Sequence, residues 1–346
     1  MTWHHATDKL NPMSTAIPEA AKPPADWEAI SQPLQPFLGE VNSALRAEVN
    51  AFDPAIGNFV QYALSNSGKQ LRPMLVGLGA GGAEATQPEH VTGAVIIEMV
   101  HLATLVHDDV MDEARVRRRR PTLSANWGNE IAVLAGDCLF AQALQRAAEF
   151  GTPSVCRAVS EATKNVCTGE ILQTLQRGNY EISRDEYMKV VAMKTAELFA
   201  LACGLGAELS GAKPARRDAV RAFGMALGTA YQVYDDCVDV FGSEPLAGKS
   251  LGTDLITGKP TLPVLAALGE LSAGEAQRLR DLVNGWAPAR GDELRELLAQ
   301  AGTLAECQRV IEKLLAEARE AISGFPAAED LCTLCNCLEA KATELE

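Results

Sequence analysis

Apolar residues recur along most of this chain with the spacing of an α-helix. Val95, Met99, Leu102 and Val106 share one helix face, and Val190 opens a second run of the same kind. Breakers separate these runs at Asp53-Pro54, Gly81-Gly82, 151–153, 211–214, 242–263 and 285–291. The chain lacks the regular alternation of apolar and polar residues that indicates strands. The pattern predicts about ten or more helices in one large all-α domain.

The composition supports helices and excludes one class of partner. Of 346 residues, 47% are apolar and only 5% are aromatic. Strands favour β-branched and aromatic residues, so this balance favours helices. The net charge of −14 argues against nucleic acid as a partner. Of the nine cysteines, Cys138, Cys167 and Cys203 lie in apolar helical stretches, which predicts buried thiols of a reducing compartment.

Residues 1–26 differ from the rest of the chain. They are rich in Pro and Ala, carry charges and lack the apolar core of a secretory signal. We expect a flexible tail over 1–26 and one domain over 27–346. No uninterrupted apolar run approaches the ~20 residues that cross a bilayer. The cytoplasm is therefore the expected location.

Two copies of one acidic pattern carry the candidate chemistry. Asp108-Asp109-x-x-Asp112 and Asp235-Asp236-x-x-Asp239 each lie in a run that is compatible with a helix. Positions i, i+1 and i+4 lie close together on a helix, so each copy should gather three carboxylates that repel one another. Dense oxygen ligands suit Mg²⁺, which keeps several waters and shares substrate phosphates. The two copies could face each other across one cavity.

Basic residues accompany both acidic motifs. The first is followed by Arg115, Arg117 and the run 118–120, and Lys69 and Arg72 precede it. The run could be a solvated face or a nucleic-acid patch, but next to carboxylates it is more typical of a diphosphate clamp. The second motif is followed by Gly-Lys pairs at Lys249 and Lys259, which suggests further phosphate contacts. The spacing does not match a P-loop.

Together these residues resemble the trans-isoprenyl diphosphate synthases, the polyprenyl synthetase family. The markers occur in the family's order from about residue 30 to 340: GKQLRP, HLATLVHDDVMDEARVRRRRPT, AGDCLFA, GEILQ, KTAELF, YQVYDDCVDVFG, GKSLGTDL and GKPTLP. The resemblance implies the isoprenoid synthase fold, a single large helical bundle that surrounds a central catalytic cavity. It further implies a homodimeric enzyme that condenses isopentenyl diphosphate with an allylic diphosphate, head to tail.

The resemblance also implies a role for each matched residue. Metal ligands that hold three Mg²⁺ ions on the allylic diphosphate are expected at Asp108, Asp109, Asp112, Asp235 and Asp239, with Asp236 as a further catalytic residue. Arg117 matches a contact to the allylic diphosphate, and Lys69, Arg72, His101 and Arg118 match the isopentenyl diphosphate pocket. Lys194, Thr195 and Lys259 match groups near the allylic diphosphate and the developing cation, and Gln232 matches a residue that positions the site.

Three departures from the family's pattern leave these matches in place. Gln70 stands where a basic residue is usual, Arg119 stands where Gly is common, and the C-terminal region lacks the usual closing Arg. Cys332 and Cys335 could suggest a metal site, but they fit a buried helix face better.

Product length in this family depends on what blocks the tunnel below the first motif. Ala103 and Thr104 lie one turn before Asp108, where short-chain enzymes usually place a bulky aromatic residue. Met99 and Val100 lie further down, and this helix contains no Phe or Tyr. We therefore expect a product of C30 or longer from a farnesyl or geranylgeranyl starter. A plug from another helix could stop growth at C20.

Other functions remain open at this point. They are a short-chain farnesyl or geranylgeranyl diphosphate synthase, a non-catalytic subunit of a heteromeric prenyltransferase, a terpene cyclase or head-to-head condensing enzyme, and a simple cation-binding helical protein. Lys69, Arg72 and the second acidic motif argue against the cyclase. The two intact motifs argue against the silent subunit. A long lipid product is compatible with transient membrane contact.

Overall fold

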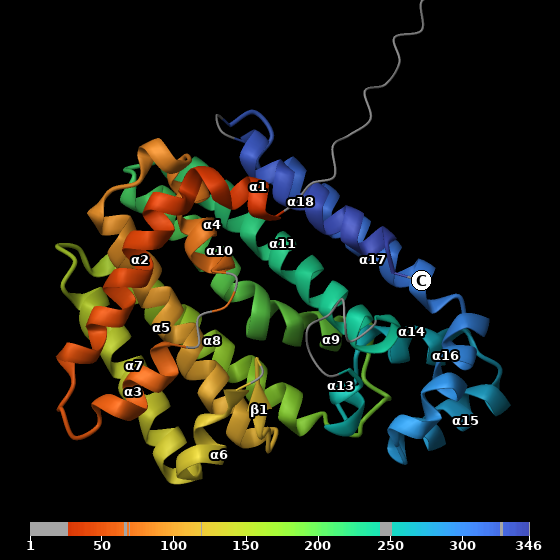
Figure 1. The fold of residues 1–346 in the computed structure, drawn as a ribbon. Coiled ribbons are helices and arrows are strands. Elements are labelled where there is room, and N and C mark those ends of the chain that lie inside the picture. Colours follow the sequence, from red (N-terminus) through yellow and green to blue (C-terminus); the bar gives the residue numbers. More distant parts are fainter. Residues whose placement is uncertain are drawn as a thin grey trace, which may run out of the picture.

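The computed structural model describes residues 27–65, 68, 70–118, 120–242, 251–325 and 328–345. The predicted tail 1–26 and the candidate residues Lys69 and Lys249 lie outside the described residues. The α-helices are α1 (Trp27–Ser31), α2 (Gln35–Ala47), α3 (Gly57–Leu64), α4 (Leu71–Ala80), α5 (Pro88–Met111), α6 (Leu123–Trp127), α7 (Asn129–Ala148), α8 (Pro153–Leu175), α9 (Arg184–Val191), α10 (Glu197–Leu209), α11 (Pro214–Phe241), α13 (Thr253–Ile256), α14 (Leu262–Glu270), α15 (Ala273–Asn284), α16 (Gly291–Gln300), α17 (Thr303–Ala321) and α18 (Ala328–Thr343) (Figure 1).

Short elements connect these helices. They are the 3₁₀ turns η1 (Gln32–Leu34), η2 (Glu48–Ala51), η3 (Ala83–Ala85) and η5 (Pro288–Arg290), the π-helix η4 (Ala192–Ala196), and the strands β1 (Val116–Arg117) and β2 (Arg120–Pro121). The prediction of an all-α fold is confirmed, with one small exception. The strands β1 and β2 form an antiparallel hairpin in which Arg117 pairs with Arg120. Two-residue strands are too short to show a periodic sequence pattern.

Helix α10 is the most deeply buried helix of the bundle. Almost every residue from Glu197 to Ala207 is buried, and the helix packs against α4, α5 and α11. A helix that is apolar all round belongs in the centre of a large helical protein. Close approach to α4 depends on Gly79 and Gly206, where an added Cβ would collide with backbone atoms of the facing helix.

Among the described residues, two helices meet the length and hydropathy of a membrane span, namely α5 and the continuous segment Arg184–Leu209 that contains α9, η4 and α10. However, 67% and 78% of their apolar windows are buried inside the protein. Such burial is typical of core helices. Figure 1 shows α5 and α10 enclosed by neighbouring helices, with α17 and α18 along one side.

The cysteines only partly match the prediction of buried thiols. Cys203, Cys335 and Cys337 are fully buried in the core, so the predicted buried face of the C-terminal helix is confirmed at Cys335, whereas Cys332 is only half-buried. Cys138 is half-buried, whereas Cys167 is exposed, so the prediction of burial was wrong for Cys167. The reason is that Cys167 lies on the face of α8 that lines the main cavity.

Candidate active site

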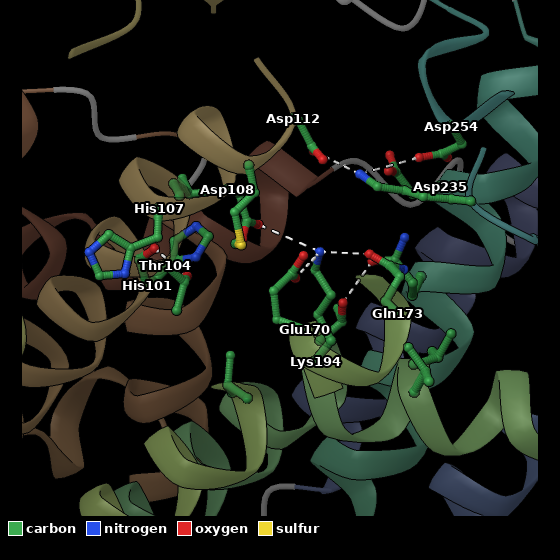
Figure 2. Close-up of a pocket in the computed structure, with 18 of the residues that line it drawn as sticks. His101, Thr104, His107, Asp108, Asp112, Glu170, Gln173, Lys194, Asp235 and Asp254 are labelled. Atoms are coloured by element: carbon green, nitrogen blue, oxygen red, sulfur yellow. Dashed lines mark hydrogen bonds and ion pairs between the residues drawn. The ribbon is translucent and has the colours of Figure 1, made fainter. Parts of the chain in front are cut away.

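The main cavity has a volume of about 730 Å³ and contains most of the candidate residues. Its walls come from α4, α5, β1, α7, α8, α9, η4, α10, α11 and the segment around α13. Figure 2 shows His101, Thr104 and Asp108 from α5 on one side, and Glu170, Gln173 and Lys194 facing them. Polar groups that converge on a pocket of this size are typical of a small-molecule site.

The first acidic motif lies at the end of α5. Asp108 and Asp109 belong to the last turn, and Asp112 is the C-cap residue. Asp109 is buried, and its Oδ1 accepts a hydrogen bond from Arg117 Nε at 2.6 Å. Burial raises the pKa of Asp109, although the Arg117 guanidinium opposes this effect. The hairpin after the motif therefore returns Arg117 to the carboxylate, a pairing that the sequence did not predict.

Asp112 is held by two cations from distant segments. Lys259 Nζ lies 2.7 Å from Oδ2, and Arg177 Nη2 lies 2.5 Å from Oδ1. Arg177 also donates to the backbone carbonyl of Met111 at 3.3 Å, at the negative end of the α5 dipole. Burial alone would raise the pKa of Asp112, but Lys259, Lys194 and Arg177 together outweigh burial, and the pKa falls below the ordinary value. Sequence reasoning missed Arg177, because a single arginine in a loop carries no local signal.

Lys194 and Thr195 lie in the π-helix η4. Single π turns inside α-helices are frequent at functional sites. Lys194 Nζ pairs with the Glu170 carboxylate, donates to Gln173 Oε1 at 2.8 Å and lies 3.7 Å from Asp108 Oδ2 (Figure 2). Glu170 and Gln173 were missed as site residues, although their GEILQ segment served as a family marker.

The charged groups around Lys194 shift one another's pKa values. Burial would lower the pKa of Lys194, but Asp108 and Glu170 outweigh it and raise the pKa. Burial raises the pKa of Asp108 to about 6, against the attraction of Lys194. Gly169 permits the close packing of α8 on η4, because an added Cβ would lie 2.7 Å from the backbone nitrogen of Lys194.

The second acidic motif divides into residues with different environments. Asp235 and Asp236 line the cavity, whereas Asp239 is buried and does not belong to the cavity wall. Asp239 instead accepts hydrogen bonds from Thr253 Oγ1 at 3.2 Å and from the backbone amide of Asp254 at 3.1 Å, at the start of α13. Asp109 is likewise absent from the wall, so metal binding by Asp109 and Asp239 stays a prediction.

Asp254 is a cavity residue that sequence reasoning did not assign. It lines the wall near Asp112 and lies 4.0 Å from Lys259 Nζ (Figure 2). The Gly-Thr-Asp sequence after the second motif was the available signal. Its backbone turn at Gly252 has a φ of 72°, which favours glycine and brings the aspartate back towards the motif.

The structure brings together the described residues that were predicted to bind isopentenyl diphosphate. Arg72, His101 and Arg118 all line the cavity. Arg72 lies over the ring of Phe199 at 5.1 Å, and burial lowers its pKa while the buried Glu98 opposes this effect. Burial and the neighbouring arginines place the pKa of His101 well below its usual value, so its imidazole is neutral at pH 7.

The predicted chain-length residues take different positions. Thr104 lines the cavity, and its Oγ1 donates to the His101 carbonyl at 2.7 Å. Met99, Val100 and Ala103 are buried in the core and do not belong to the cavity wall. An aromatic side chain does reach the wall from another helix, because Phe140 of α7 lines the cavity.

The donor set on the cavity wall fits a hard cation. Asp108, Asp112, Asp235 and Asp254 bring carboxylate oxygens to one space, together with Lys259. Among the described residues, no three His, Cys, Asp or Glu side chains are grouped closely enough to hold a metal ion by themselves. Carboxylates of this kind suit a divalent cation that completes its coordination shell with water and substrate phosphates.

Comparisons with known proteins agree with this geometry. A family model described as polyprenyl synthetase matches residues 53–301. The chain is 36% identical over 256 residues to octaprenyl diphosphate synthase of Escherichia coli, which covers 74% of this chain and 79% of that protein. It is 38% identical over 239 residues to component 2 of the heptaprenyl diphosphate synthase of Geobacillus stearothermophilus, covering 68% and 74%.

A solved structure extends the similarity to three dimensions. The crystal structure of a polyprenyl synthase from Caulobacter crescentus, complexed with calcium and isoprenyl diphosphate, has a TM-score of 0.85 and 27% sequence identity. The match covers 92% of this chain and 99% of the other. The fold, the two acidic motifs and these similarities lead to one conclusion: the chain belongs to the polyprenyl synthetase family, has the isoprenoid synthase fold and is a trans-prenyltransferase.

Proposed function

We propose that this prenyltransferase condenses isopentenyl diphosphate with farnesyl or geranylgeranyl diphosphate in a Mg²⁺-dependent, head-to-tail reaction. The products are an all-trans polyprenyl diphosphate of C30 or longer and diphosphate. The observation that carries the proposal is the meeting of both acidic motifs with Lys194 and Lys259 around one cavity. Carboxylates for metal ions and cations for phosphates then face the same bound diphosphate.

The residues divide into two binding regions. Arg117, Lys194 and Lys259 lie beside the acidic motifs, so they suit the allylic diphosphate. Arg72 and Arg118, with neutral His101, form a second group on the same cavity wall, which suits isopentenyl diphosphate. Asp108, Asp112 and Asp235, with Asp109 and Asp239 behind them, would hold Mg²⁺. The metal would neutralise charge on the leaving diphosphate.

The condensation consumes no reactant other than the two diphosphate substrates. The bond between C1 of the allylic substrate and its diphosphate oxygen breaks, and Lys194 and Lys259 stabilise the departing charge. The double bond of isopentenyl diphosphate then attacks C1, and the departed diphosphate takes the proton that the new cation loses. No protein base is required. The apolar part of the wall, which includes Leu105 and Val166, keeps water from the cation.

Product length is expected to depend on Thr104. The wild-type enzyme should yield products of C30 or longer. Thr104→Phe should shorten the main product to C20 or less, because the larger ring fills part of the cavity one helical turn from Asp108. The measurement is chromatographic sizing of dephosphorylated products made from labelled isopentenyl diphosphate. Thr92→Phe, on the same helix but outside the cavity wall, is the matched control and should leave product length unchanged.

The same assay decides between long-chain and short-chain synthesis. A dominant C15 or C20 product from the wild-type protein would contradict the proposed length. Phe140→Ala then identifies the stop, because removing the aromatic ring from the α7 wall should lengthen that product. An unchanged C20 product in Phe140→Ala would place the stop elsewhere.

We further propose that residues 27–346 act as one catalytic domain in a cytoplasmic homodimer, in transient contact with a membrane when product leaves. Exposed apolar side chains outside the cavity wall support an interface at Leu134 of α7 and Leu175 of α8. The relative named component 2 raises the alternative of an obligatory second protein.

Light scattering should give twice the chain mass, and the purified protein should turn over alone. Activity that requires a second polypeptide would contradict the homodimer.

A further inference from the structure

Asp236, the middle carboxylate of the second acidic motif, has both oxygens engaged by neutral donors. Tyr187 Oη donates to Oδ2 at 2.6 Å, and Gln232 Nε2 donates to Oδ1 at 2.7 Å. The side chain is only 4% exposed. Asp236 therefore differs from the three aspartates of the first motif, whose carboxylates pair with Arg117, Lys194 and Lys259. Its contacts are those of a fixed hydrogen-bond acceptor.

The two hydrogen bonds to Asp236 fix the donor and acceptor directions in a longer chain of hydrogen bonds. Tyr187 and Gln232 both donate to Asp236, so the amide nitrogen of Gln232 faces that side chain. The amide oxygen then faces Thr195, whose Oγ1 lies 2.8 Å away and must be the donor. With its proton committed to Gln232, the Thr195 hydroxyl has only lone pairs left for the cavity that it lines.

Tyr187 is held at the start of this chain by local structure. It lies in the first turn of α9, whose N-terminus is fixed by the reciprocal Ser183 and Glu186 capping box. The phenol ring is buried, and α9 continues without a break through η4 into α10. Tyr187 and Thr195 thus lie on one continuous helical segment, and Gln232 and Asp236 lie on α11.

We propose that Tyr187 is a positioning residue for the condensation: it anchors Asp236 so that the chain Tyr187–Asp236–Gln232–Thr195 presents the lone pairs of the Thr195 hydroxyl to the allylic cation. The inference rests on the proposed function, because it needs a cation in this cavity. Loss of the Tyr187 hydroxyl leaves one oxygen of Asp236 without its donor, so Asp236 and the Gln232 amide can rotate. Thr195 then loses its fixed orientation.

The first test is Tyr187→Phe, which keeps the ring and removes only the hydroxyl. Loss of such an outer partner typically costs about 10- to 100-fold in activity, and we expect that loss in kcat. The KM for isopentenyl diphosphate should stay within about 2-fold, because the residues assigned to that substrate, Arg72, His101 and Arg118, are not members of this chain of hydrogen bonds. Tyr180→Phe is the matched control: Tyr180 is also buried, but its hydroxyl has no hydrogen-bond partner in the described structure. That variant should match the wild type.

The second test is a double-mutant cycle with Thr195→Val. If Tyr187 acts through Thr195, the double variant should lose no more activity than Thr195→Val alone. The reason is that Thr195→Val already removes the hydroxyl that Tyr187 orients. Losses that multiply would overturn the proposal, as would a Tyr187→Phe variant that equals Tyr180→Phe. A Tyr187→Phe variant that unfolds in the assay would also overturn it, because the role would then be stability. Failure of the wild-type protein to condense the two diphosphates would instead reject the proposed function.

Discussion

Replacing Asp108 or Asp235 with asparagine is expected to lower the condensation rate about 1,000-fold, because stabilisation of the leaving charge by bound metal accounts for several kcal/mol of the barrier. Asparagine keeps the shape of the side chain and removes its charge. Both residues lie on the cavity wall, but they come from different motifs and different helices. If the motifs form one site, each substitution alone should nearly abolish turnover and raise the Mg²⁺ concentration needed for the remaining activity.

The matched control for these variants is Asp218→Asn. Asp218 lies on α11 with Asp235, but its side chain is 66% exposed and its partner is the neighbouring Arg217. Initial rates should be measured for all three variants over a series of Mg²⁺ concentrations. A loss below about 10-fold in either cavity variant, with an unchanged response to Mg²⁺, would contradict a shared metal-dependent site.

Replacing Lys194 with methionine is expected to reduce kcat about 100- to 1,000-fold, which is the range for loss of one donor that stabilises charge in a transition state. Methionine keeps much of the apolar stem but removes the ammonium group beside Asp108. The buried Glu170 would then lack its cation, and a carboxylate left unpaired in this way also destabilises the fold. Rates and thermal unfolding should therefore be measured together.

A double variant separates the two effects of Lys194. Adding Glu170→Gln to Lys194→Met removes the unpaired charge, so thermal stability should recover while kcat stays low. Lys189→Met, in the exposed part of α9, is the control and should change neither quantity. If activity returned with stability in the double variant, Lys194 would have a structural role only, and its assignment to the leaving group would be wrong.

The fold was predictable because burial imposes the helical period on the sequence. Val95, Met99 and Leu102 share the buried face of α5, as their spacing indicated. The β1–β2 hairpin could not be predicted in this way, since its strands contain two residues each. The π-helix η4 was equally hidden, because a single turn of five residues is too short to show a period of its own and the helix that follows it is buried on all sides.

The sequence predicted which residues belong to the candidate site better than it predicted how those residues are arranged. Sequence placed three carboxylates of each motif together, but the structure separates Asp109 and Asp239 from the cavity wall by pairing them with Arg117 and the start of α13. Such partners come from later in the chain, so helix geometry alone cannot reveal them. Arg177 and Tyr187 became visible only when α8 and α9 were placed beside the motifs.

The contacts also bear on the simplest alternative, a helical protein that only binds cations. Asp112 is paired with Lys259 and Arg177, and Asp109 is paired with Arg117. A protein that served only to bind metal ions would gain nothing from protein cations on its carboxylates. Cations and carboxylates around one cavity are instead suited to a ligand that carries phosphate groups and binds together with metal.

The most direct measurement of the central claim is incorporation of labelled isopentenyl diphosphate into polyprenyl product by the purified full-length protein, with farnesyl diphosphate as starter. Reactions should run with Mg²⁺ and with EDTA, beside the Asp108→Asn and Asp235→Asn variants. The account predicts products of C30 or longer only for the wild-type protein with Mg²⁺, and almost none in the other reactions. Equal incorporation with EDTA, or near wild-type incorporation by either variant, would contradict one diphosphate-ionising site built from both motifs.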